Sequence, residues 1–117
     1  MTIEGALGVA LVDYNSGMTL GTDGGGPDLD LEIAAAGYAE VVKAKMRTMS
    51  ELGPDDRIED MVTTLGTQVH LIRLLARAEA QGLFIFVALD RPTSNLAIAR
   101  HELHSIEDLL FSRAREF

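Results

Sequence analysis

Three groups of residues in this sequence have types and spacings that could support chemistry, and the first is a glycine-rich segment. Gly21-Thr22-Asp23-Gly24-Gly25-Gly26 precedes an expected helix, and helix N-termini attract anions such as phosphate. The segment matches neither a dinucleotide fingerprint nor a P-loop, which requires a Lys and a Ser or Thr where the helix begins. Asp28, Asp30 and Glu32 stand instead where a phosphate would bind, and their charges would repel it. We therefore interpret this segment as a connection.

The second group is a pair of histidines in the expected C-terminal helix. His101 and His104 are three residues apart, so both imidazoles could approach one metal ion. The zinc-protease signature requires a spacing of four, an intervening Glu and a third ligand. His70 is the only other imidazole in the chain. Both histidines of the pair lie beside an apolar stripe, so we interpret them as a solvated helix flank and expect no metal site.

The third group is the serines, which would be the nucleophiles of a hydrolase. None lies in a nucleophile-elbow context such as G-x-S-x-G. The chain contains no Cys, which excludes thiolate zinc sites and cysteine nucleophiles, and its carboxylates fall in polar turns and on helix faces. We expect no catalytic residue, no cofactor and no enzymatic activity. The serines considered are Ser16, Ser50, Ser94, Ser105 and Ser112.

Length and composition indicate one globular domain. The chain has 117 residues, of which 47% are hydrophobic, and that is enough for a single packed core. We expect one domain over residues 3–112 and a charged tail over 113–117. The N-terminus lacks a signal-peptide pattern, and no apolar run approaches the roughly 20 residues that cross a bilayer. These features predict a cytoplasmic protein that does not bind a membrane.

The charge distribution favours a protein partner. The net charge is −8, and the first 42 residues contain seven acidic side chains and no Lys or Arg. Such a surface repels phosphate backbones, and there is no basic stripe with interleaved aromatic residues to offset that repulsion. We therefore expect no nucleic-acid partner, and we expect a protein partner with a basic patch.

The N-terminal half predicts a hairpin followed by a long helix. Ala6 to Asp13 is Val- and Leu-rich and reads as a buried strand, and Met18 to Thr22 is the returning strand after a turn. The glycines and the proline of the 23–27 segment predict a loop. Either Asp28 or Asp30 can cap the helix that follows, and that helix is expected to end at Gly53.

This helix has two different faces. Apolar residues recur at three- and four-residue spacings from Leu31 to Leu52, which indicates one buried stripe. We predict that the opposite, mostly polar face is the surface that meets a partner protein; a plain solvated face is the alternative. The predicted partner-facing residues are Glu32, Ala36, Glu40, Lys43 and Arg47.

The C-terminal half predicts further strands and a final helix. Ile58 to Thr67 is Thr-rich and favours a strand, whereas Gln68 to Leu75 reads either as a second strand or as part of a helix that continues to Gln81. Leu83 to Leu89 is apolar throughout and predicts a central strand. Asn95 is expected to cap the last helix, whose apolar face comprises Leu96, Ala99, Leu103, Ile106 and Leu110.

Strands in hairpins with helices gathered on one face predict an α+β fold, a two-layer sandwich around an antiparallel sheet. One strand has an unusual character. Met61-Val62-Thr63-Thr64-Leu65 contains no charge, although charges usually protect an exposed edge strand. We predict that it lies at a sheet edge and pairs with a second copy of the chain, in a homodimer. The alternative is a strand inside the monomer's own sheet.

Four segments together resemble the roadblock / dynein light chain family. They are GALGVALVDYNSGMTLG, DLEIAAAGYAEVVKA, IEDMVTTLGTQVHLIRLL and LFIFVALDRPTSNLAIAR, and the similarity extends from about Gly5 to Leu110. Their common pattern is a Val-Asp-x-x-x-Gly hairpin, an Ala-rich helix, a Thr-Thr strand and an Asn-Leu-Ala-x-Ala-Arg segment. The family usually has a short helix before its first strand, for which residues 1–4 leave little room.

The resemblance implies a five-stranded antiparallel sheet, with a long helix between strands 2 and 3 and a C-terminal helix, in which the 68–75 window is a strand. It also implies a homodimer formed through the middle strand and the long helix, and a non-catalytic scaffold or regulator of a small Ras-like GTPase. The bacterial branch of the family is the most similar. A dynein-type structural adaptor or a small-molecule sensor is the alternative function.

Overall fold

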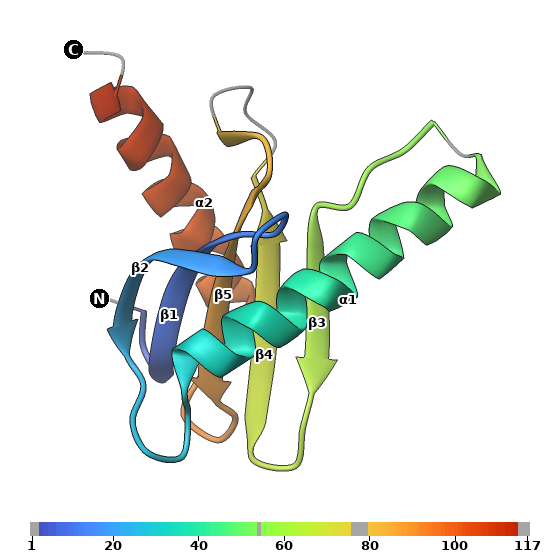
Figure 1. Cartoon of the computed structure of the whole chain (residues 1–117). Coiled ribbons are helices and arrows are strands. Elements are labelled where there is room, and N and C mark those ends of the chain that lie inside the picture. Colours follow the sequence, from blue (N-terminus) through green and yellow to red (C-terminus); the bar gives the residue numbers. More distant parts are fainter. Residues whose placement is uncertain (1–2, 54, 76–79, 115–117) are drawn as a thin grey trace.

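The computed structural model describes the backbone of residues 3–53, 55–75 and 80–114, and side chains as far as residue 109. Five strands and two helices follow one another along the chain (Figure 1). They are β1 (Ala6–Asp13), β2 (Met18–Gly24), α1 (Leu31–Leu52), β3 (Asp60–Thr64), β4 (Gln68–Leu74), β5 (Leu83–Asp90) and α2 (Leu96–Ala114). Neither helix contains a described stretch that is long and apolar enough to cross a bilayer.

The strands form one antiparallel sheet in the order β2-β1-β5-β4-β3. The predicted central strand is confirmed, because β5 lies in the middle and Phe84 to Leu89 are buried on both faces of the sheet. Phe84 and Phe86 point to one face, and Ile85 and Val87 to the other. A strand with no polar side chain on either face requires cover on both sides, and the two helices supply it.

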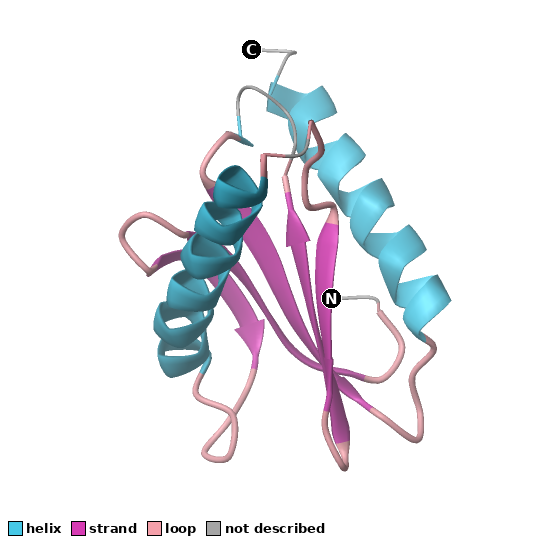
Figure 2. Ribbon diagram, turned by 90° about the vertical axis from the view of Figure 1, so that its right-hand side faces the viewer, coloured by secondary structure: helices cyan, strands magenta, loops and turns pink. Residues whose placement is uncertain are grey.

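Helices α1 and α2 cover opposite faces of the sheet (Figure 2). Ala35, Ala39 and Val42 of α1 pack on one face, whereas Ala99 and Leu103 of α2 pack on the other. The predicted α+β class, the antiparallel sheet and the positions of both helices in the chain are confirmed. The two-layer arrangement with both helices on one face is wrong, because the apolar faces of β5 need a helix each.

The ends of α1 follow from local chemistry. Asp30 is the N-cap, and its side chain accepts hydrogen bonds from the backbone N–H groups of Glu32 and Ile33 at 3.0 and 3.2 Å. Gly53 adopts the left-handed conformation at φ 77°, and its N–H donates to the carbonyls of Met49 and Ser50. The predicted helix is therefore confirmed, with Asp30 rather than Asp28 as its cap.

Three boundaries differ from the prediction. β2 continues to Gly24, so the loop begins two residues later than expected. β3 comprises only Asp60–Thr64 of the predicted 58–67 segment. The 68–74 window is a strand, because it pairs with both β3 and β5 and buries Leu71 and Ile72 on opposite faces. Contacts distant in sequence thus override the helical propensity of this window.

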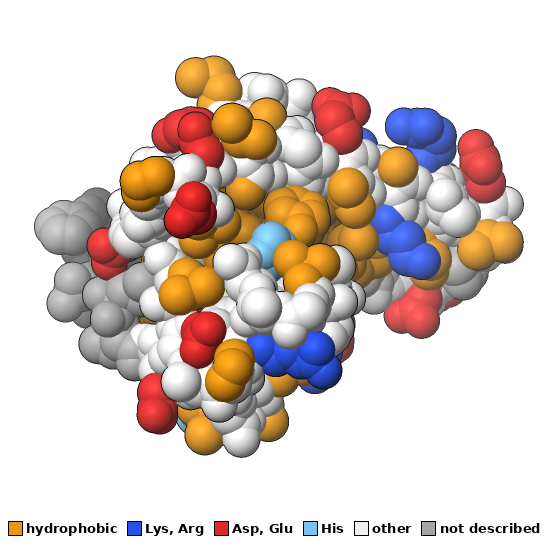
Figure 3. Space-filling model, turned by 90° about the horizontal axis from the view of Figure 1, so that it is seen from below, with side chains coloured by type: hydrophobic (Ala, Val, Ile, Leu, Met, Phe, Trp, Pro, Cys, Tyr) orange, Lys and Arg blue, Asp and Glu red, His pale blue; other side chains and the backbone are white. Residues whose placement is uncertain are grey.

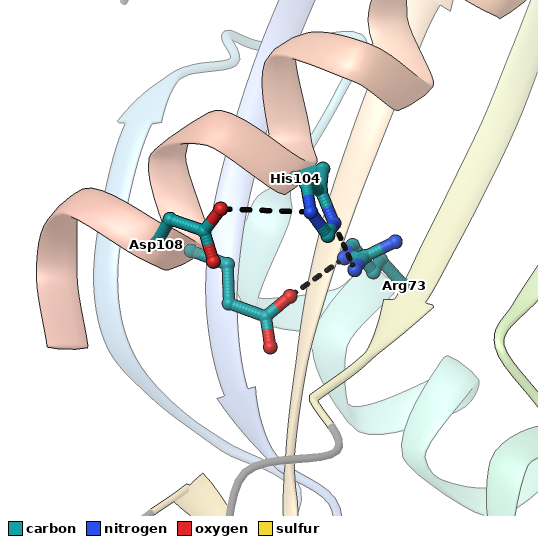
Figure 4. Close-up of polar contacts among 4 residues, drawn as sticks. Arg73, His104 and Asp108 are labelled. Carbon is teal, nitrogen blue, oxygen red and sulfur yellow. Dashed lines mark hydrogen bonds and ion pairs between the residues drawn. The ribbon is translucent and has the colours of Figure 1, made fainter.

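A buried ion pair joins β4 to α2 (Figure 4). Nε of Arg73 donates to Oε2 of Glu107 at 2.8 Å, and only 5% of the Glu107 side chain is exposed. Nη2 of Arg73 also lies 2.9 Å from Nδ1 of His104, whose Nε2 lies 3.5 Å from Oδ2 of Asp108. The guanidinium therefore holds the C-terminal half of α2 against the sheet.

We expect Glu107→Ala to lower the free energy of unfolding by about 2 kcal/mol, because it leaves the partly buried Arg73 without its carboxylate. Urea denaturation followed by circular dichroism measures this change. The control is Glu40→Ala, which removes the exposed pair of Glu40 with Lys43 and should cost no more than about 0.5 kcal/mol. Equal losses of unfolding free energy in the two variants would contradict a larger contribution of the buried pair to stability.

Candidate functional site

Strand β3 lies at one edge of the sheet and pairs only with β4 among the described residues. Met61 to Thr64 of the predicted segment therefore lie at an edge of the monomer's sheet and not inside it, and Leu65 follows the strand. Val62 and Leu65 are 36% and 41% exposed, Thr63 and Thr64 are exposed, and Met61 is half-buried against α1. The edge therefore presents apolar and hydroxyl side chains and no charge from residue 61 to 65.

The backbone groups that face outward on this edge can be identified from the ladder. Leu65 donates to the carbonyl of Gln68 at 2.8 Å, so these two residues form a hydrogen-bonded pair. Such pairs alternate along an antiparallel ladder, so Met61 and Thr63 also bond to β4. The N–H and C=O groups of Asp60, Val62 and Thr64 consequently point away from the sheet.

A bidentate ion pair fixes the start of this edge on the α2 side. Nε and Nη2 of Arg100 lie 2.8 and 3.1 Å from the two carboxylate oxygens of Asp60. At the other end, Nη1 of Arg91 donates to the carbonyl of Leu65 at 3.1 Å. Both arginines hold the strand in place without occupying its outward backbone groups between residues 61 and 64.

The flank of α1 that carries Tyr38, on the side of β4, is apolar as far as Val41, and the exposed Lys45 follows one turn later. A shallow depression on it is lined by Ile33, Ala34, Gly37, Tyr38 and Val41. Ile33 and Val41 are 72% and 44% exposed and line the same depression, so they form a contiguous apolar patch. This flank and the β3 edge adjoin, so together they form one unpartnered surface, which we call the β3–α1 surface.

A polar cluster inside this region was not predicted from the sequence. The hydroxyl of Tyr38 is hydrogen-bonded to Nδ1 of His70, and Nε2 of His70 lies 2.7 Å from Oε1 of Gln68. Both rings also pack against the buried ring of Phe86, with centroid distances of 5.1 and 5.2 Å. Seen from below, the molecule has a hollow in which hydrophobic side chains surround a histidine (Figure 3).

The hydrogen bonds of this cluster fix one neutral tautomer of His70. The amide oxygen of Gln68 can only accept, so Nε2 carries the hydrogen, and Nδ1 accepts from the Tyr38 hydroxyl. Burial lowers the pKa of His70 and raises the pKa of Tyr38, because each charged form loses hydration. His70 therefore stays neutral at a pH at which an exposed histidine begins to take up a proton. Its partners on α1 and β5 are distant in sequence, so no local signal marks it.

The predicted partner-facing residues lie together on the opposite flank of α1, next to the β1–β2 hairpin. Both carboxylate oxygens of Glu32 accept from the hydroxyl of Thr19, at 2.9 and 3.1 Å. Lys43 forms an exposed ion pair with Glu40 at 2.8 Å. Ala36 and Arg47 are exposed. This charged flank lies on the β2 side of the helix and leaves the β3–α1 surface apolar.

The other candidates from the sequence are not brought together. His101 is exposed, and Nδ1 of His104 faces the Arg73 guanidinium, a cation that disfavours a metal at that nitrogen. The described residues contain no group of three or more His, Cys, Asp or Glu side chains that could hold a metal ion. In the glycine-rich segment, Gly24, Gly25 and Gly26 adopt positive φ values, and the connection turns directly into the Asp30 cap.

Solved structures with the same fold include MglB from Myxococcus xanthus, with 19% identity and a TM-score of 0.78 over 95% of this chain and 78% of that one. A Roadblock/LC7 domain from Streptomyces avermitilis gives 14% identity and a TM-score of 0.76, over 94% and 86% of the two chains. MglB with tetrameric arrangement gives 16% identity and a TM-score of 0.75, over 96% and 79%. No protein-family model matches the sequence, and no curated protein is similar to it at the sequence level.

The chain therefore has the roadblock fold, and its structural neighbours include the bacterial protein MglB. This confirms the resemblance of the sequence at the level of the fold. The identities lie below 20%, so what the chain does has to be argued from its own surfaces.

The neutral state of His70 predicts how stability depends on pH. The folded chain resists protonating this ring, whereas the unfolded chain takes up the proton near pH 6.5. The free energy of unfolding contributed by His70 is therefore present above about pH 6.5 and is lost as pH falls below it. We expect urea denaturation between pH 7.5 and 5 to give a steeper loss for the native chain than for His70→Gln. Identical slopes for the two proteins would contradict a neutral His70 in the fold.

Proposed function

We propose that this protein is a non-catalytic homodimer that binds and regulates a small Ras-like GTPase. The observation that carries the proposal is the β3–α1 surface, an uncharged edge strand beside an apolar helix flank in a roadblock fold. Residues 3–112 act as one roadblock-like domain, in the cytoplasm of a bacterium.

The proposed dimer joins two β3 strands about a two-fold axis. Asp60, Val62 and Thr64 point their backbone groups outward, so two antiparallel copies centred on Val62 would exchange hydrogen bonds along the whole edge. The two sheets then form one continuous sheet. The α1 helices would lie side by side above it and cover Ile33 and Val41.

The proposed GTPase contact uses the charged flank of α1, formed by Glu32, Ala36, Glu40, Lys43 and Arg47. This flank faces away from the β3 edge, so both flanks of the dimer remain accessible while the strands are paired. Its mixture of acidic and basic side chains suits a charged protein surface, where electrostatic complementarity sets specificity and association rate. The GTPase itself is inferred from the family resemblance of the sequence.

Regulation in this proposal acts through the conformation of the GTPase. GTPase switch loops are ordered by the γ-phosphate and released after hydrolysis, so a partner that binds the ordered loops favours one nucleotide state. We propose that the charged flank selects the ordered loops in this way. Catalytic groups then remain those of the GTPase, and the dimer contributes binding energy only.

Binding of the dimer to the GTPase is expected to depend on the bound nucleotide. In pull-down and titration experiments with Ras-like GTPases of the host, we expect tighter binding to the form loaded with a non-hydrolysable GTP analogue than to the GDP form. Arg47→Glu should weaken that binding by about tenfold or more, because it reverses an exposed charge on the flank. The matched control is Arg57→Glu, an exposed arginine in the loop before β3 that should have no effect. Failure to bind in both nucleotide states would refute the proposed function.

A further inference from the structure

The exposed large hydrophobic side chains fall into two groups. Five lie on α1, β3 or the residue after β3, namely Ile33, Val41, Leu52, Val62 and Leu65. The other five lie on β1, β2 and α2, namely Leu7, Met18, Leu20, Ile98 and Leu109. The proposed dimer covers side chains of the first group only. The exposure of the second group is therefore not accounted for by the dimer.

A groove in the α2 face of the sheet adjoins this second group. Its floor is formed by Val9 and Leu11 of β1 and Ile85 of β5, and one wall by Leu103 and Ile106 of α2. The other wall is the 21–23 segment of β2. Its lining is almost entirely apolar, although it is open to solvent. We call this the α2–β2 groove.

The dimensions of the sheet explain why the groove exists. Five strands about 4.8 Å apart span about 19 Å from the first strand axis to the last, whereas one helix with its side chains is about 10 Å wide. The ion pairs of Arg73 with Glu107 and of Arg100 with Asp60 tie α2 to β4 and β3. The β1–β2 side of the same face is therefore left with room for one more helix, because packed helices lie 8–10 Å apart.

Helix α2 presents a second apolar flank toward this space. Ile98, Glu102, Ile106 and Leu109 are spaced by four, four and three residues, so they share one side of the helix. Ile106 lines the groove, whereas Ile98 and Leu109 are 50% and 58% exposed. Helix α2 thus has apolar residues both toward the sheet and toward the groove, as expected for a helix with a helical neighbour.

Among the described side chains, those charged groups that line or flank the groove are acidic. Asp23 lines it, Glu102 lies on the α2 flank, and Glu4 follows Ile3, which also lines it. The first 42 residues, which supply the β1–β2 side, contain no Lys or Arg. We propose that the α2–β2 groove binds a basic amphipathic helix of a partner protein, its apolar face against β1 and α2 and its cationic residues beside these carboxylates.

Gly21 allows this proposal to be tested without disturbing the fold. A Cβ atom added at Gly21 would meet no atom within 4 Å, and the residue is not among those with positive φ. Gly21 pairs with Leu11, and both line the groove, so a larger side chain at Gly21 would lie on the groove side of the sheet. Gly66, in the turn between β3 and β4, has the same properties and does not line the groove, so it gives a matched control.

The test uses the whole chain and a synthetic peptide of Leu and Lys that forms an amphipathic helix of about 14 residues, roughly 21 Å long. We expect NMR titration to shift the amide signals of Leu11, Gly21 and Leu109. Gly21→Gln should weaken peptide binding by about tenfold or more, whereas Gly66→Gln should bind like the native chain. A peptide with Glu in place of every Lys should also bind at least about tenfold more weakly.

Three results would overturn this proposal. The first is a peptide that shifts signals elsewhere or binds Gly21→Gln unchanged. The second is equal binding of the Glu-containing peptide, because it would remove the charge complementarity. The third is a change in the oligomeric state of the protein without peptide when Gly21 is replaced by Gln. That change would show that a second copy of the chain occupies the groove. The proposal does not rest on GTPase binding. A failure of peptide binding in the groove can therefore be distinguished from a failure of GTPase binding.

Discussion

The absence of polar side chains from Leu83 to Leu89 of β5 is the constraint on which the rest of this structure depends. From Leu83 to Leu89 both sides of the strand are apolar, so both faces of the sheet must be covered. The described part of the chain has two long helices, and one lies on each face. Two helices cannot cover ten strand faces, which leaves apolar surface at the margins of the sheet. Both proposed binding surfaces lie at these margins.

The two edges of the sheet differ in how they are protected. β2 is interrupted by a bulge opposite Leu11 and Val12, contains two glycines and carries Asp23, all features that discourage strand pairing. β3 has a regular ladder and no charge between Met61 and Leu65. An edge that is both regular and uncharged invites pairing, and the adjoining apolar flank of α1 extends the surface that a second copy would bury. This contrast is the physical reason for placing self-association at β3 and helix binding beside β2.

The sequence predicted the features that depend on neighbouring residues. The hairpin, the end of α1 at Gly53 and the central position of β5 all follow from short patterns, whereas the N-cap was left open between Asp28 and Asp30. The side of the sheet on which each helix packs is a long-range property, and that prediction was wrong. The strand at Gln68–Leu74 was ambiguous for the same reason, because its pairing with β3 and β5 outweighs its propensity. The edge at Met61 to Leu65 was predicted because missing charge is visible in the sequence itself.

The cluster around His70 and the α2–β2 groove lay beyond sequence reasoning for a related reason. Tyr38 and His70 are 32 residues apart, and Phe86 comes from a third element. The groove is formed by β1, β2, β5 and α2, and its apolar character appears only once the width of the sheet exceeds the width of one helix. Such sites are set by packing, so they become visible only in three dimensions.

The most direct test of the central claim is the mass of the protein in solution. Light scattering across a range of concentrations should give a dimer for the native chain and for Val62→Thr, which keeps the outward N–H. Val62→Pro removes that N–H without breaking a bond to β4, and edge strands tolerate proline. A folded Val62→Pro monomer is the result that pairing through β3 predicts. A Val62→Pro protein that remains a dimer would contradict it, as would a native chain that is monomeric at every concentration.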